Sequence, residues 1–171
     1  ARQNALLGVQ VALGQLQTEM GPDRRISATA SLLDEDPQTD AIEGVGQPHW
    51  TGGWNSLNWD RSSQVNTPVS TLEDASDGKP LSFRAWLVSG VSDASLTATL
   101  RLAIAQTFSS TSANAVQLVG EGTLGAVTAV ELAQQSVYVP RQAIVGAEGS
   151  LRESGYAYWV GDEGVKARYG N

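Results

Sequence analysis

The 171-residue chain contains no cysteine, and it has a single histidine, His49. The lack of cysteine excludes disulfides, thiolate catalysis, and zinc or iron–sulfur sites built on cysteine. One imidazole is too few for a histidine-rich metal site. No run of about 18 apolar residues is present that would span a membrane. We therefore expect no cofactor, and Ca²⁺ is the only ion for which candidate ligands are considered below.

Positive charge is also scarce, since 11 Lys and Arg residues face 18 Asp and Glu residues, giving a formal charge of −7. A nucleic-acid partner is not expected, because neutralising phosphates requires clustered Lys and Arg. Docking on an anionic membrane surface is excluded for the same reason. With 41% hydrophobic residues, the composition indicates one globular domain over residues 1–171.

Residues 1–21 are predicted to form an amphipathic helix that ends at Gly21 and Pro22. Its apolar residues recur at alternating spacings of three and four, which is typical of a helix–helix seam; they are Leu6, Val9, Leu13, Leu16 and Met20. Five polar residues are expected on the opposite face: Gln3, Gln10, Gln15, Gln17 and Glu19. Either the stripe packs on the core of the domain, or this is the C-terminal half of a longer helix, because no N-cap residue precedes the apolar pattern.

Residues 22–79 are rich in Gly, Pro, Asn and Asp, and we expect mostly loops there. Three tryptophans lie in this segment: Trp50, Trp54 and Trp59. Exposed and coplanar, they would form a platform for a carbohydrate ligand. Aliphatic residues are sparse around them, so the favoured interpretation is a buried structural cluster that supplies the missing core.

Residues 80–171 are expected to be mainly antiparallel sheet. Alternating or β-rich runs predict the following strands, the last two joined as a hairpin: Leu96–Ile104, Ala115–Val119, Ala126–Leu132, Ser136–Val139, Tyr156–Val160 and Val165–Tyr169. Before them, Pro80–Ser89 is predicted as a short helix. The whole is an α+β fold, with the N-terminal helix packed on an antiparallel sheet.

Motifs for catalysis are weak. Ser76–Lys79 matches S-x-x-K, but Gly78 and Pro80 place it on a loop. Gly120–Gly125 matches G-x-G-x-x-G, yet the following residues indicate a strand, so a β-hairpin is favoured over a nucleotide site. Asp162 and Glu163 could act as an acid–base pair or as weak Ca²⁺ ligands, although neighbours on a tight turn point apart and a surface turn is favoured. We expect that the chain is not an enzyme.

An ordered set of segments along nearly the whole chain resembles the type IV pilin-like proteins of the Verru_Chthon cassette protein A kind. The segments are Ala1–Leu7, Ala12–Gln17, Gly21–Ala30, His49–Trp54, Ala85–Gly90, Val116–Gly120 and Tyr156–Arg168. The resemblance implies a prepilin-like protein, whose basic leader and apolar membrane helix would lie upstream of this head region.

The resemblance and the helix seam together predict a non-catalytic structural subunit of an extracellular or cell-surface, pilus-like or pseudopilin-type assembly. Its partners would be copies of itself or other pilin-like subunits, bound through the N-terminal helix. The protein would be exported to the cell surface or medium, with the periplasm a possible location, and would contact a membrane only through a missing upstream segment. The alternative is a surface-exposed carbohydrate-binding or adhesin module that uses Trp50, Trp54 and Trp59.

Overall fold

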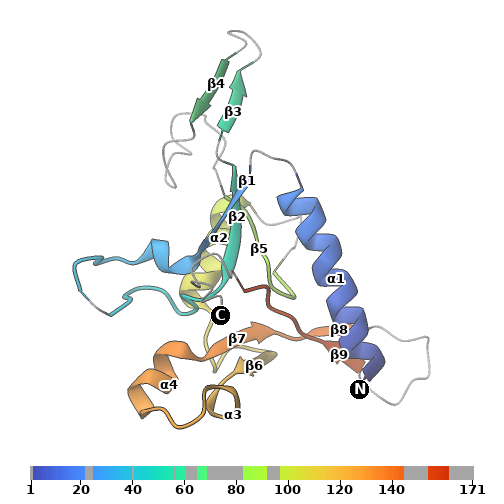
Figure 1. Ribbon diagram of the computed structural model, residues 1–171, viewed down its shortest axis with the longest axis vertical. Helices are drawn as coiled ribbons and strands as arrows, with labels where there is room; N and C mark the ends of the chain where they lie inside the picture. Colours follow the sequence, from blue (N-terminus) through green and yellow to red (C-terminus); the bar gives the residue numbers. More distant parts are fainter. Residues whose placement is uncertain are drawn as a thin grey trace, which may run out of the picture.

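Helices and antiparallel strands together build the fold, so the expected α+β class is confirmed. The computed structural model describes residues 2–21, 25–39, 41–55, 57–60, 65–68, 83–91, 97–144 and 154–161, and Figure 1 shows their arrangement. The helices are α1 (Arg2–Met20), the 3₁₀ turn η1 (Ala30–Leu33), α2 (Ala98–Thr107), α3 (Glu121–Leu124) and α4 (Ala129–Gln135). The strands are β1 (Arg25–Thr29), β2 (Thr51–Asn55), β3 (Leu57–Asp60), β4 (Val65–Pro68), β5 (Phe83–Trp86), β6 (Ala115–Val119), β7 (Val137–Pro140), β8 (Gln142–Ile144) and β9 (Ser154–Tyr156).

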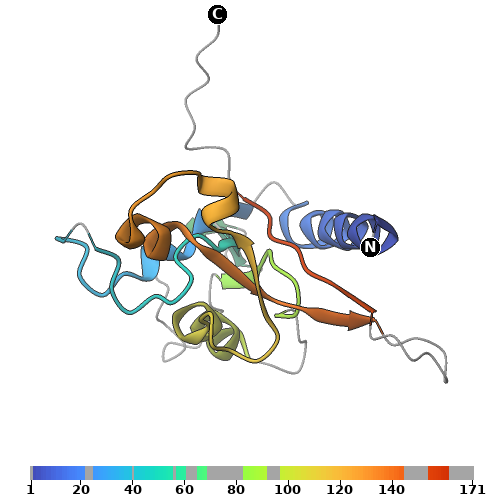
Figure 2. The same ribbon diagram turned by 90° about the horizontal axis from the view of Figure 1, so that it is seen from below.

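A three-stranded antiparallel sheet in the order β1-β2-β5 forms the centre of the molecule. Helix α2 packs beside β5, and α1 runs along the outside of the molecule past β1 and β9 (Figures 1 and 2). Strands β3 and β4 form a separate two-stranded ladder. Four strands thus lie inside the segment that was expected to be mostly loop.

Aromatic side chains fill the space between the sheet and α2. The ring of Trp86 contacts three others, with centroid distances of 6.2 Å to Trp50, 5.6 Å to Trp54 and 4.9 Å to Phe83. All four side chains are buried. The indole N–H of Trp86 donates to the carbonyl of Arg101 in α2 at 2.9 Å, so the polar atom of this buried ring is satisfied and also fixes the helix.

The outer edge of β7 is closed by side chains instead of a strand. On its inner edge β7 pairs with β6. On the other side, Gln47 Oε1 accepts the backbone N–H of Tyr138 at 2.9 Å, and Trp50 Nε1 donates to the carbonyl of the same residue at 2.9 Å. Gln47 is almost fully buried, and its amide also donates to the carbonyl of Gly46 at 2.7 Å.

Ser89 connects the central sheet to the C-terminal part of the chain. Its hydroxyl donates to the Pro140 carbonyl at 2.6 Å and accepts the N–H of Tyr158 at 3.2 Å. Beside it, Val88 forms an antiparallel bridge with Trp159. The segment after β9 therefore extends the sheet beyond β5, while β9 itself pairs with β8.

Two predicted strands are helices. Residues Leu96–Ile104 alternate in polarity, but 98–107 form α2, and Leu100 is largely exposed. The buried residues of this region, Ala105 and Phe108, have helical spacing. Thr97 caps the helix, because its side chain accepts the N–H of Leu100 at 3.3 Å.

The strand predicted over Ala126–Leu132 is likewise wrong, because α4 occupies most of it. Thr128 and Glu131 form a capping box, in which Glu131 N donates to Thr128 Oγ1 at 3.2 Å and Thr128 N donates to Glu131 Oε2 at 2.8 Å. The Thr128 hydroxyl also donates to Glu131 Oε2 at 2.8 Å, and the hydrogen bonds that the Glu131 carboxylate accepts from the backbone N–H and the hydroxyl of Thr128 lower its pKa. The hairpin expected at Gly120–Gly125 is the single turn of α3.

The described part of the predicted helix Pro80–Ser89 contains strand β5, so that prediction is wrong. Phe83, Ala85 and Trp86 are buried and Arg84 is partly buried, so the strand lacks the alternation that would distinguish it from a helix. Of the predicted C-terminal hairpin, Tyr156 ends β9 and pairs with Gln142 of β8. The other arm, Val165–Tyr169, lies outside the described residues.

Replacing Gln47 by leucine should destabilise the fold. The change leaves the N–H of Tyr138 and the carbonyl of Gly46 buried without partners, and each unsatisfied group costs on the order of 1–3 kcal/mol. Urea unfolding should show the loss as a lower midpoint. The same change at exposed Gln106 on α2 should cost at most about 0.5 kcal/mol. Equal midpoints for Gln47→Leu and Gln106→Leu would mean that the edge of β7 does not need Gln47.

Candidate functional site

The predicted helix seam faces outward over most of its length. Leu6, Val9 and Leu13 are 56%, 56% and 53% exposed, while Leu16 and Met20, nearer the end of α1, are partly buried. An apolar row of this kind normally lies against a core. Among the described residues nothing covers it, so α1 presents its apolar stripe to the surroundings.

The opposite face of α1, which includes half-buried Leu7 and Val11, holds the helix to the body. Gly8 is buried, and a β-carbon added there would lie 3.6 Å from Tyr156 Cβ, so α1 approaches β9 closely at this point. Asn4 Nδ2 donates to the Gly155 carbonyl at 3.3 Å, and Gln15 Nε2 donates to the Trp86 carbonyl at 3.0 Å. Gln15 thus lies on the face opposite the stripe, as expected, and that face meets the body.

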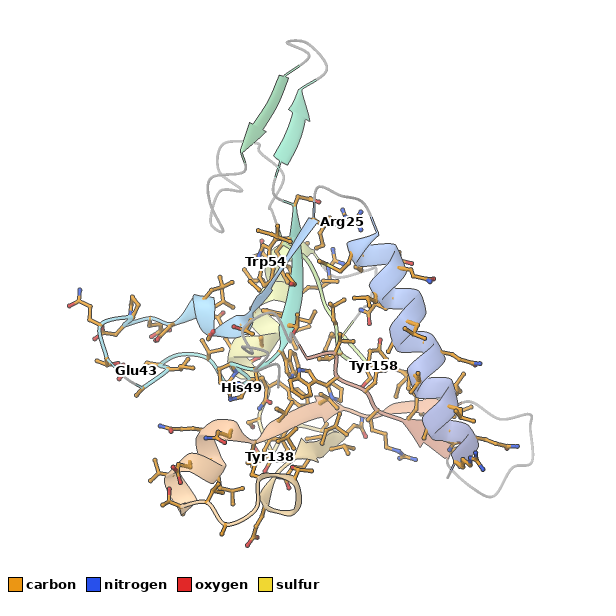
Figure 3. All side chains as sticks on the ribbon, in the orientation of Figure 1. Arg25, Glu43, His49, Trp54, Tyr138 and Tyr158 are labelled. Carbon is orange, nitrogen blue, oxygen red and sulfur yellow. The ribbon has the colours of Figure 1, made fainter. Side chains whose placement is uncertain are left out.

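Tyr158 completes this contact from the body side. Its hydroxyl donates to Gln15 Oε1, so the Gln15 amide bonds both to β5 and to the segment after β9. Burial, and then the neighbouring ring of Tyr156, raise the pKa of Tyr158 to about 12. The two tyrosine rings are stacked with centroids 6.3 Å apart. Figure 3 shows Tyr158 between the centre of the molecule and α1.

Charged groups hold the C-terminal end of α1. The Arg25 guanidinium donates to the carbonyls of Thr18 and Glu19, which are among the last acceptors of the helix, and a cation there also complements the helix dipole. The carboxylate of Glu19 lies 3.5 Å from Arg84 Nε on β5. Glu19 therefore also lies on the body-facing side, opposite the stripe, as expected. Gly53 leaves room for the sulfur of Met20, which would lie only 2.8 Å from a β-carbon there.

Beyond Arg2 at its start, the outward face of α1 is uncharged. From Gln3 to Thr18 the helix contains no Asp, Glu, Lys or Arg, although the chain as a whole has a formal charge of −7. The exposed glutamines Gln3, Gln10 and Gln17 recur every seven residues and lie beside the apolar stripe, so the expectation that they occupy the opposite face is wrong. Two copies of this face could meet without the like-charge repulsion that acts elsewhere between the subunits.

The tryptophans of the middle segment do not form an exposed platform. Trp50 and Trp54 are 0% and 4% exposed, so the favoured interpretation as a buried cluster is confirmed for both. Trp59 is placed on β3 by its backbone, and its side chain lies outside the described residues.

No catalytic constellation was found among the described residues. His49 Nε2 donates to the backbone carbonyl of Gln134 at 2.7 Å, which ties the only imidazole to the end of α4. Within the described ranges no group of three or more His, Asp or Glu side chains could hold a metal ion. Asp162 and Glu163, like Ser76–Lys79, lie outside the described residues.

Among the same residues, no helix is both long enough and apolar enough to cross a membrane.

Comparison with known proteins gave no family model, no curated protein and no solved structure that matches the chain.

The sequence pattern predicted the apolar stripe on α1, but not that the opposite face attaches the helix to the body. The signal was available in part: Gly8 and Gln15 are seven residues apart and lie on one side of a helix, with Asn4 and Glu19 near them. That these polar groups would find backbone carbonyls and an arginine on the body depends on β5 and β9, whose positions the sequence pattern does not define.

Alkali should weaken the attachment of α1. Because the pKa of Tyr158 is raised, this tyrosine stabilises the fold fully below its ordinary pKa of about 10, and that contribution is lost as the pH rises towards about 12. An absorbance titration of tyrosinate should show one of the four tyrosines ionising late. The late step should vanish in Tyr158→Phe and persist in the control Tyr138→Phe. A late step that survives in Tyr158→Phe would assign it to another residue.

Proposed function

We propose that the chain is a non-catalytic structural subunit of a pilus-like filament or pseudopilin-type assembly at the cell surface or outside the cell. The observation that carries the proposal is the outward apolar stripe of α1, formed by Leu6, Val9 and Leu13. Contiguous exposed apolar side chains on one helix face are typical of a protein–protein contact. The resemblance of the sequence segments to pilin-like proteins supports the same class of protein.

The partner is a second copy of the chain or another pilin-like subunit, packed helix against helix. Spacings of three and four place Leu6, Val9, Leu13 and Leu16 along one seam, as helices that associate over several turns require. The seam and its flanking glutamines carry no charge, so identical faces are compatible. Since the body of the subunit is attached to the other face of α1, helices can come together with their heads on the outside.

A structural role also fits the state of the groups that catalysis would use. The imidazole of His49 bonds to a backbone carbonyl, and no described serine or carboxylate is its hydrogen-bond partner. We propose accordingly that the protein is exported and that its acidic, Ser- and Thr-rich head faces the medium.

Acidic substitutions in the stripe should abolish self-association. Burying a half-exposed leucine contributes about 1 kcal/mol, so the four leucines at positions 6 and 13 of two copies would together change the dissociation constant by about 1000-fold. In sedimentation over a concentration series, the parent chain should exceed its monomer mass of 18.0 kDa, whereas Leu6→Asp with Leu13→Asp should stay monomeric.

The matched control is Leu100→Asp on α2, where the leucine is 55% exposed but lies on another surface. It should associate as the parent does. Because the chain has no native cysteine, Val9→Cys should also give a disulfide-linked dimer on mild oxidation, whereas Leu100→Cys should not. A parent chain that remains monomeric, or equal loss of association in Leu100→Asp, would contradict the proposal.

A further inference from the structure

A cavity of about 540 Å³ opens where three separate segments meet. The loop 41–49 forms one wall, the turn after α2 forms the second, and the end of α4 with β7 forms the third. His49 and Tyr138, both labelled in Figure 3, come from two of these walls. A volume of this size is within the range of roughly 300–1,000 Å³ found for small-molecule sites.

No Asp, Glu, Lys or Arg is among the described residues that line the cavity. Hydroxyls and amides surround it, and its apolar part consists of aliphatic side chains and the half-buried ring of Tyr138. The exposed side chains of Ser110, Gln134 and Gln135 form no hydrogen bond among the described residues, so they are available to a ligand. An ionic ligand would find no carboxylate, ammonium or guanidinium partner on these walls.

Main-chain recognition of a peptide strand is blocked on this side of β7. The N–H of Tyr138 is taken by the Gln47 amide and its carbonyl by the Trp50 indole. Adding a strand needs those groups free. The lining groups thus suit a ligand that is uncharged, rich in hydroxyls, and has apolar C–H faces that can lie on Tyr138.

We propose that this cavity binds one or two rings of a neutral saccharide. Its polar rim, with Ser110, Gln134 and Gln135, bonds to sugar hydroxyls, while Tyr138 and Val45 contact the ring carbons. Hydrogen bonds join two of its walls, because Gln47 Oε1 accepts the N–H of Tyr138 and His49 Nε2 donates to the Gln134 carbonyl. This site differs from a tryptophan platform, since Trp50 and Trp54 lie beneath the surface.

The test is a titration of the full chain with glucose, galactose, N-acetylglucosamine and their β-linked disaccharides, up to about 50 mM, followed by amide NMR shifts. At least one sugar should give saturable shifts clustered at residues 109–110 and 134–138. Gln135→Ala combined with Ser110→Ala should weaken binding by about 10-fold or more, because both positions are exposed and their substitution spares the core.

Gln142→Ala on β8 and Leu6→Asp on α1 are the controls, and both should bind the sugar as the parent chain does. Absence of saturable shifts with every sugar would overturn the proposal. If neutral tripeptides gave saturable shifts and sugars did not, the proposed ligand class would be wrong. If the sugar-induced shifts lay away from residues 109–110 and 134–138, the proposed site would be wrong. Because α1 takes no part in the cavity, none of these outcomes depends on self-association.

Discussion

The packing of Trp86 is the interaction on which most of the fold depends. Its ring contacts Trp50, Trp54 and Phe83, its N–H bonds to α2, and its carbonyl accepts from Gln15 of α1. One residue thus joins the sheet, the helix on its inner side and the helix on its outer side. Opposite Trp86 in the ladder stands Gly52, where a β-carbon would lie 3.0 Å from the Trp86 ring and 2.5 Å from that of Trp54. The glycine-rich strand β2 is therefore what makes room for the large rings.

Because the core is filled by aromatic rings, Leu6 and Leu13 of α1 can remain exposed, while Leu7 and Leu16 are only partly buried. The helix is attached by hydrogen bonds and by the close approach at Gly8. Such bonds are directional, and each contributes only about 1 kcal/mol net, so several are spread along the helix. Because one face of α1 is attached to the body, the apolar stripe on the other face stays free. An internal apolar attachment and an external apolar contact would otherwise compete for the same side chains.

The sequence predicted those elements whose signals are local. Helix α1 and strands β6 and β7 follow from periodicity and from the stops at Gly21 and Pro140. The alternation of apolar and polar residues at 96–104 wrongly predicted a strand, because a helix that contains small residues can show the same alternation. The signal that pointed to a helix was Thr97, which caps its N-terminus. The stripe was visible in the sequence, but its exposure was not, since spacing identifies a face and not what lies against it. The cavity near His49 joins segments about 85 residues apart, which no pattern within either segment could indicate.

The two proposed surfaces lie on opposite sides of the molecule. In Figures 1 and 2, α1 lies on one side, and α4 with the loop 41–49 lies on the other, across the central sheet. Helices meeting through their outward stripes would place the cavity away from the contact and towards the medium. Assembly and ligand binding would then be compatible in the same subunit, because neither uses the other's side chains. A filament of such subunits would present one cavity per subunit, so that weak binding of a single sugar ring would be strengthened by repetition along a glycan chain.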